Sequence, residues 1–339
     1  MRRLLNVLYV TLPQAYLSKE GETILVRQEQ ETRLRVPILA LEGIVCFGQV
    51  SMSPALMAFC SERNVGVSFL SDHGKFLARI QGPIHGNVLL RREQYRRADT
   101  ELGSAAVARS VLLAKVANGR TALLRAAREH PSEMVDRASD QLGDSLRALE
   151  STSTLDGLRG VEGDAAHSYF SVFDELILQQ KETFVFHERS RRPPLDNVNA
   201  LLSFLYVLLA HDVSSALETV GLDPAVGFLH RDRPGRAGLA LDLMEELRPV
   251  LADRVALTLI NRRQIAPSGF ARSDSGAVTM NDATRKEVLV AWQSRKQEEI
   301  LHPFLDERIP FGLVPYAQAL LLARFLRGDL DAYPSFFWR

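Results

Sequence analysis

The chain has 339 residues, of which 46% are hydrophobic and 24% are charged, so it has ample core for two domains and is not wholesale disordered. Lys plus Arg and Asp plus Glu number 41 each, so any attraction to nucleic acid must come from local basic patches. Cys46 and Cys60 lie in apolar runs without metal-site spacing, which indicates buried thiols in a reducing cytoplasm. No apolar stretch approaches the ~20 uncharged residues that span a bilayer, so we expect no membrane association.

The first part of the chain alternates short β-rich segments with turns. We predict strands at residues 5–10, 16–18, 23–28, 32–37, 43–47, 66–70 and 75–81. A helical pattern interrupts them at residues 54–63, with Ser53 as N-cap and Pro54 at the first helical position. These patterns predict a small N-terminal β domain over residues 1–84.

Beyond residue 84 the apolar residues recur three and four apart, which is typical of amphipathic helices. The clearest stripe covers residues 196–220 and ends at Gly221. We predict further helices at residues 104–129, 137–149, 154–180, 239–251, 282–300 and 315–328. A charged link at residues 189–194 and a loop at residues 263–276 separate some of them. The fold class is therefore α+β, with a β-rich domain followed by a larger all-α domain over residues 85–339.

An acidic residue between two glycines is the first candidate for chemistry. Glu162 lies in a helical pattern between Gly160 and Gly163, and each helical glycine costs about 1 kcal/mol relative to alanine. That cost suggests a packing or functional reason, because backbone or substrate can approach a glycine closely. The plain alternative is a solvated helix glutamate near a flexible turn.

An imidazole and two carboxylates follow later in the chain. His230 ends an apolar run, while Asp242 and Glu245 lie three apart on one helix face. With Glu162 they supply hard oxygen ligands and one imidazole, a set suited to Mn²⁺ and tolerable for Mg²⁺. Glu246 points in a neighbouring direction and is the poorer candidate. A structural histidine and a solvated acidic face are the plain alternatives.

Arginine groups could hold DNA phosphates without reading sequence. The candidates for DNA binding are Arg91, Arg92, Arg96, Arg189, Arg191, Arg192, Arg262 and Arg263. The alternative is that they lie on solvated helix faces beside acidic residues.

Several motifs in fixed order resemble one family. They are Gly160-Val-Glu162-Gly, Asp196-Asn-Val-Asn199, Gly227-Phe-Leu-His230 and Leu241-Asp242-Leu-Met-Glu245. In this order the chain closely resembles the CRISPR-associated endonuclease family Cas1, over nearly its whole length. The segment Arg91-Arg-Glu-Gln-Tyr95 looks most like the type I-C branch.

This resemblance implies a DNA integrase and endonuclease of CRISPR adaptation that depends on Mg²⁺ or Mn²⁺. It implies metal ligands at Glu162, His230 and Glu245, with Asp242 as a nearby catalytic acid. Many members have Asp where this chain has Glu245, which leaves the division of roles with Asp242 open. The implied reaction is attack by the 3′-hydroxyl of a captured DNA fragment on a phosphodiester at the edge of a CRISPR repeat. The implied partners are DNA, a second copy in a homodimer, the Cas2 protein and a Cas4 nuclease.

Two questions stay open at this point. A catalytically silent scaffold that binds DNA ends through arginine patches is the alternative function. The aromatic segment at residues 333–338 either docks on a partner or packs back onto its own subunit.

Overall fold

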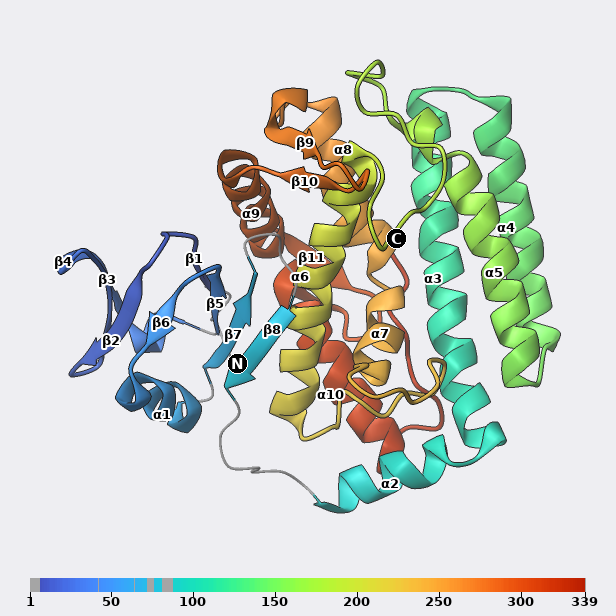
Figure 1. The fold of residues 1–339 in the computed structure, drawn as a ribbon. Helices are drawn as coiled ribbons and strands as arrows, with labels where there is room; N and C mark the ends of the chain where they lie inside the picture. Colours follow the sequence, from blue (N-terminus) through green and yellow to red (C-terminus); the bar gives the residue numbers. More distant parts are fainter. Residues whose placement is uncertain (1–6, 42, 64, 72–75, 81–87, 339) are drawn as a thin grey trace. The chain divides into compact units, whose positions relative to one another are not determined.

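The computed structural model describes residues 7–41, 43–63, 65–71, 76–80 and 88–338 (Figure 1). The chain divides into two compact units, one formed by residues 1–85 and 280–297, the other by residues 86–279 and 298–339. The predicted domain boundary between residues 84 and 85 lies outside the described residues. The segment 280–297 groups with the first unit, although the sequence pattern assigns it to the helical domain.

The first unit contains two four-stranded sheets. One has the order β1 (Val7–Val10), β5 (Gly43–Phe47), β7 (Gly66–Leu70) and β8 (Phe76–Ile80), with the first three strands parallel. The other has the order β4 (Glu31–Pro37), β3 (Thr23–Gln28), β2 (Tyr16–Glu20) and β6 (Ser51–Met52). The unit also contains the 3₁₀ helix η1 (Ile38–Ala40) and the helices α1 (Pro54–Glu62) and α9 (Asp282–Gln297). The predicted strands are present, and the outer ends of the first and last lie outside the described residues.

Apolar side chains hold the strands of this unit together. Leu17, Ile24, Ile44 and Leu56 are fully buried in one core cluster, which also takes in the thiol of Cys60. As predicted, α1 starts at an N-cap serine, since Oγ of Ser53 accepts a hydrogen bond from the backbone N–H of Leu56.

The second unit is mainly helical. Three helices pack side by side: α3 (Glu101–Glu129), α4 (Glu133–Ser151) and α5 (Leu155–Ser171) (Figure 1). A second group contains α6 (Asn197–Val220), α7 (Gly238–Glu245) and α10 (Val314–Leu326). The remaining elements are α2 (Val88–Ala98), η2 (Phe173–Leu176), η3 (Arg248–Ala252), α8 (Asp253–Asn261), η4 (Pro267–Gly269), β9 (Phe270–Arg272), β10 (Val278–Met280), β11 (Glu299–His302), β12 (Glu307–Pro310) and η5 (Phe311–Leu313).

Two helical predictions need correction, and one helix was not predicted. The helix expected over residues 154–180 ends at Ser171 and is followed by a 3₁₀ turn. The helix expected over residues 239–251 breaks at Glu245, and a π-helical turn with Pro249 near its start follows, because proline cannot donate the next hydrogen bond. Helix α2 escaped prediction because it buries only Leu90 and Gln94 and has no apolar stripe.

Helix α6 is an exception to the expectation that no stretch is long and apolar enough to span a bilayer. By length and composition it is long and apolar enough to cross one. In the structure its side chains Leu201, Leu205 and Leu209 are fully buried within the helical unit. Burial in this core accounts for its apolar character.

The aromatic segment at residues 333–338 packs onto the helical unit of its own chain. The exposed fraction is 4% for Tyr333 and 1% for Phe336, while Phe337 stays 41% exposed. Of the two alternatives for this segment, the structure has packing within the subunit.

Candidate metal and active site

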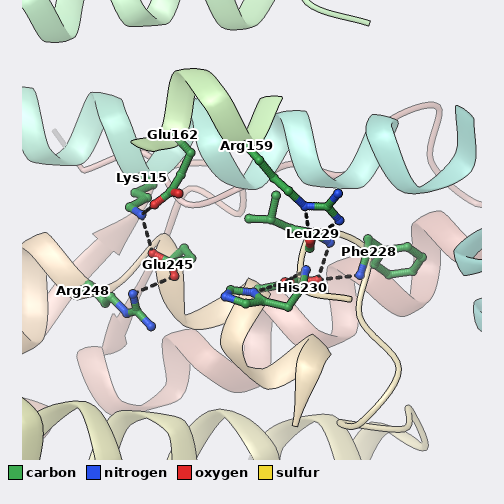
Figure 2. Close-up of polar contacts among 9 residues, drawn as sticks. Lys115, Arg159, Glu162, Phe228, Leu229, His230, Glu245 and Arg248 are labelled. Carbon is green, nitrogen blue, oxygen red and sulfur yellow. Dashed lines mark hydrogen bonds and ion pairs between the residues drawn. The ribbon is translucent and has the colours of Figure 1, made fainter. Parts of the chain in front are cut away.

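Four segments of the helical unit bring the candidate residues together (Figure 2). Helix α5 carries Glu162, and the loop before α7 carries His230. Helix α7 itself carries Asp242 and Glu245. Helix α3 adds Lys115, which the sequence patterns did not single out.

Asp242 is a buried carboxylate, and both of its oxygens accept hydrogen bonds. Its Oδ2 accepts hydrogen bonds from the backbone N–H groups of Phe228 at 2.6 Å and Leu229 at 2.9 Å. Its Oδ1 accepts from the backbone N–H of His230 at 3.0 Å and from Nδ1 of that residue at 2.6 Å. These donors use the four lone-pair positions of a carboxylate. Asp242 therefore orients the imidazole and has no capacity left for a metal.

Gly227 and Gly238 make room for the hydrogen bonds between Asp242 and the loop at residues 228–230. A Cβ on Gly227 would lie 2.7 Å from the carbonyl carbon of Gly238 and 2.8 Å from Oδ2 of Asp242. A Cβ on Gly238 would in turn lie 2.8 Å from the carbonyl oxygen of Ala225. The loop can lie directly on the start of α7 because neither position has a side chain.

Arg159 ties the helix of Glu162 to the loop of His230. Its Nε and Nη2 donate to the carbonyl oxygen of Leu229 at 3.1 and 2.7 Å. Asp242 thus accepts from the N–H groups of the loop, and Arg159 donates to the carbonyl of Leu229 (Figure 2). Because Arg159 and Glu162 are three apart on α5, they share one face of that helix.

Glu245 is buried between two cations. Its Oε1 lies 2.7 Å from Nη1 of Arg248, and its Oε2 lies 2.9 Å from Nζ of Lys115. Burial would raise the pKa of Glu245, but Arg248 and Lys115 outweigh it and lower the pKa to about 2. The carboxyl of Glu245 is therefore ionised at neutral pH.

Lys115 also forms an ion pair with Oε1 of Glu162, so one ammonium joins two candidate ligands. His230 lies close enough to lower the pKa of Glu245 electrostatically, and Figure 2 shows its imidazole on the Glu245 side of the loop. Within the described part of the chain, no group of three His, Cys, Asp or Glu side chains is assembled closely enough to hold a metal. Instead, the ammonium of Lys115 lies between the carboxylates of Glu162 and Glu245.

The donor set nevertheless fits a divalent metal. Oε2 of Glu245 is a buried oxygen that faces only the ammonium of Lys115, at 2.9 Å, among the contacts that the structure gives it. The Nδ1–H of His230 is held by Asp242, which leaves Nε2 as the free donor atom. Two carboxylates and one imidazole suit Mn²⁺ and are tolerable for Mg²⁺.

A pocket of about 360 Å³ opens beside His230. Thr100, Asp156, Arg159 and Arg231 are among its lining residues. Asp156 pairs with both arginines, since its Oδ1 lies 2.7 Å from Nη1 of Arg159 and 2.8 Å from Nη2 of Arg231. The pocket wall therefore carries both signs of charge.

The aromatic residues near the motifs are structural partners of a buried acid. Tyr206 donates to Oδ1 of Asp253 at 2.7 Å, and Tyr169 donates to Oδ2 at 3.1 Å. Burial raises the pKa of Asp253 to about 6, against these donors and Arg248. This network borders a small cavity that Glu162 also lines.

The candidate DNA-binding arginines differ in their surroundings. Arg189 is part-buried and donates to Oδ1 of Asn199 at 2.6 Å and to Oγ of Ser203 at 3.1 Å. Arg91 is half-buried, and Arg263 donates to Gln179 at 2.8 Å. The exposed members are Arg92, Arg96, Arg191, Arg192, Arg262 and Arg263.

A family model and full-length relatives place this chain in a known group. The family model described as CRISPR associated protein Cas1 matches residues 8–294. The chain is 51% identical to CRISPR-associated endonuclease Cas1 1 of Chlorobaculum tepidum, over the whole of both chains. It is 52% identical to CRISPR-associated endonuclease Cas1 2 of Rhodospirillum rubrum, again over the whole of both chains.

The chain is also similar to a fused protein, to a chain in a complex and to a solved structure of the same fold. A Cas4/Cas1 fusion of Geobacter sulfurreducens is 35% identical, and the match spans 60% of that protein. A Cas6-RT-Cas1–Cas2 complex contains a chain with a TM-score of 0.81 at 20% identity, covering 99% of this chain and 36% of that one. A casposase bound to integration product has a TM-score of 0.85 at 20% identity, covering 98% and 94% of the two chains.

The fold of a Cas1 protein from Thermotoga maritima agrees as well, with a TM-score of 0.82 at 23% identity over 95% of this chain and 97% of that one. The motifs, the fold and the relatives that match over full length agree with one another. The chain therefore belongs to the Cas1 family of CRISPR-associated endonucleases.

Proposed function

We propose that the protein is a divalent-metal-dependent DNA endonuclease and integrase of CRISPR adaptation. Glu162, His230 and Glu245 would hold Mg²⁺ or Mn²⁺, and Asp242 would position His230. The observation that carries this proposal is the contact between Oδ1 of Asp242 and Nδ1 of His230 at 2.6 Å. A carboxylate that fixes one nitrogen of an imidazole and frees the other is the usual arrangement around a metal-binding histidine.

The contacts of Asp242 and Glu245 indicate a different role for each acid. Asp242 accepts four hydrogen bonds and cannot also bind a metal, whereas each oxygen of Glu245 has a single cationic partner, Arg248 for Oε1 and Lys115 for Oε2. We therefore assign the third ligand to Glu245, although Asp242 lies on the same helix. The extra methylene of Glu relative to Asp gives Glu245 a longer reach.

The proposed reaction is transesterification at phosphorus. The 3′-hydroxyl of a DNA fragment gives up its proton as its oxygen bonds to phosphorus, the bond from that phosphorus to the 3′-oxygen of the strand under attack breaks, and the departing oxygen takes up a proton. The metal, when bound, would stabilise charge on the attacking and leaving oxygens. The contribution of the chain is positioning, since Asp242, Arg159 and Arg248 hold the loop and the carboxylate in place.

Single substitutions test the site. Glu162→Ala, His230→Ala and Glu245→Ala should each abolish strand transfer with Mn²⁺ while circular dichroism and DNA affinity stay close to wild type. Asp164→Ala is the matched control, because Asp164 is an exposed acid two positions from Glu162 on α5. Wild-type activity in all three variants would show that the site is assigned wrongly.

A catalytically silent DNA-end-binding scaffold is the alternative function. It predicts salt-sensitive DNA binding without any metal effect. Incubating the protein with branched DNA and Mn²⁺, with and without chelator, separates the two functions. Product that forms only with free Mn²⁺ excludes the scaffold.

We propose that the protein acts in the cytoplasm, as a homodimer that joins Cas2 and a Cas4 nuclease on DNA. A fused Cas4/Cas1 relative and a structural neighbour in a Cas1–Cas2 complex support these partners. The Arg91–Tyr95 segment supports the type I-C branch. Size-exclusion chromatography with light scattering, with and without Cas2, tests the assembly.

A further inference from the structure

Lys115 lies between the two carboxylates that we assign to the metal (Figure 2). Its Nζ forms an ion pair with Oε1 of Glu162 and lies 2.9 Å from Oε2 of Glu245. The side chain of Lys115 is only 15% exposed, and that of Glu245 is 3% exposed. A metal that bridges these two carboxylates would need the same oxygens.

Both oxygens of Glu245 already face a cation. Arg248 pairs with the other oxygen of Glu245, so two cations face two carboxylates. A divalent ion adds positive charge beside two cations in a partly buried place, where screening by water is weak. Metal binding without a further anion is therefore opposed by electrostatics.

We propose that Lys115 is an internal counter-ion that competes with the metal for Glu162 and Glu245, and that DNA phosphate relieves this competition. The proposal rests on the metal site proposed above. A phosphodiester brings negative charge to the site and offers the displaced ammonium a new partner. Lysine suits this exchange because its ammonium is a compact charge on a flexible four-carbon stem.

Coupling between two ligands is reciprocal. If DNA raises the affinity for metal, metal raises the affinity for DNA by the same factor. Removing the ammonium should tighten metal binding in the absence of DNA. It should also reduce the increase in metal affinity that DNA causes. A lysine that only orients the two carboxylates for the metal predicts the opposite, because its loss would weaken metal binding.

The experiment is a titration of the full chain with Mn²⁺, with free ion followed by electron paramagnetic resonance. Each protein is titrated alone and with a duplex whose single-stranded 3′ ends are dideoxy-terminated, which blocks strand transfer. For Lys115→Met we expect the Mn²⁺ dissociation constant without DNA to fall by about tenfold, and the DNA-dependent gain to shrink by a similar factor. Lys115→Arg keeps the charge and should bind Mn²⁺ as weakly as wild type.

Lys181→Met is the control, because Lys181 is exposed in the same unit and should leave both constants unchanged. Lys115→Gln provides a second neutral variant if the methionine variant fails to fold by circular dichroism. Equal or weaker Mn²⁺ binding by the folded neutral variants, relative to wild type, would overturn the counter-ion proposal alone. Absence of Mn²⁺ binding by every protein, with and without DNA, would overturn the metal site and this proposal with it.

Discussion

The Nδ1 of His230 lies 2.6 Å from Oδ1 of Asp242, and the same carboxylate also binds the backbone N–H of His230. The contact fixes the ring and its tautomer together, because a carboxylate oxygen can only accept. The side chain of Asp242 is 2% exposed and that of His230 is 20% exposed. The acid is therefore inside the fold, and the imidazole reaches toward the surface.

Replacing Asp242 by Asn should separate positioning from binding of DNA. The amide keeps the size but has one oxygen for four donors, so the loop and the imidazole lose their alignment. We expect Mn²⁺ affinity to fall by about 10- to 100-fold, as for other partners of metal-binding histidines. Calorimetric Mn²⁺ titration measures this fall, and DNA affinity in EDTA is the control. An unchanged Mn²⁺ constant would contradict the role of Asp242.

Two glycines should respond to alanine in opposite directions. Gly227→Ala places a Cβ 2.7 Å from the carbonyl carbon of Gly238 and should destabilise the fold by about 2 kcal/mol. Gly160 has nothing within 4 Å of its Cβ position, so Gly160→Ala should stabilise α5 by roughly 0.5–1 kcal/mol. Urea unfolding of both variants measures the difference. Equal losses of stability would contradict this picture.

The buried carboxyl of Glu246 predicts a pH-dependent effect of the aromatic tail. It accepts hydrogen bonds from Tyr333 Oη at 2.7 Å, from Phe336 N at 2.7 Å and from Gln318 Nε2 at 2.9 Å. Burial nevertheless raises the pKa of Glu246 from 4.5 to about 7. The folded state thus holds this proton more tightly than the unfolded state. The resulting stabilisation, about 3 kcal/mol, is complete below pH 4.5 and is lost as the pH rises to about 7.

Tyr333→Phe removes one donor to the ionised form of Glu246, so its cost should grow with pH. We expect a loss of about 1.5–3 kcal/mol at pH 8 and a smaller loss at pH 5. Urea unfolding at the two pH values tests this, with Phe337→Ala as control because Phe337 is 41% exposed. A loss of the same size at both pH values would show that the Tyr333 hydroxyl does not act through the charge of Glu246.

The arginines should fall into two classes. Arg92 and Arg96 are exposed on α2, so Arg92→Ala and Arg96→Ala should weaken DNA binding and lower its salt dependence. The slope of log K against log salt should decrease by about 0.9 for each DNA phosphate that the variant no longer neutralises.

Arg189→Ala should instead lower stability, because this guanidinium is part-buried and bound to Asn199 and Ser203. Fluorescence anisotropy over a range of salt concentrations and thermal unfolding distinguish the classes. A stable Arg189→Ala variant with a reduced salt slope would place Arg189 on DNA.

The strands of the first unit and the long helices follow from periodicity, since each repeats its pattern over enough residues to be recognised. The strands near residues 270–310 are three or four residues long and too short for such a pattern. The grouping of α9 with the first unit depends on contacts distant in sequence. No local signal encodes such contacts.

The proposed ligands could be predicted because each lies in a recognisable motif. The residues that hold them could not, because Lys115 lies 47 positions from Glu162 and Arg159 lies 70 positions from Leu229. In the sequence, Lys115 and Arg159 look like ordinary helix residues, because their partners come close only in the folded chain. The roles of Asp242 and Glu245 also needed the structure, since only the count of hydrogen-bond donors separates two acids on one helix face.

The burial of the aromatic tail bears on when the site can form during synthesis. Glu246, next to the proposed ligand Glu245, depends on donors from Tyr333 and Phe336, which the ribosome adds after every proposed ligand. Asn118, one turn along α3 from Lys115, also donates to the carbonyl oxygen of Phe336 at 2.8 Å. A nascent chain therefore contains every proposed ligand before it contains the residues that hold Glu246 and Asn118. We expect the buried network behind Glu245 to close only after residues 333–336 have been made.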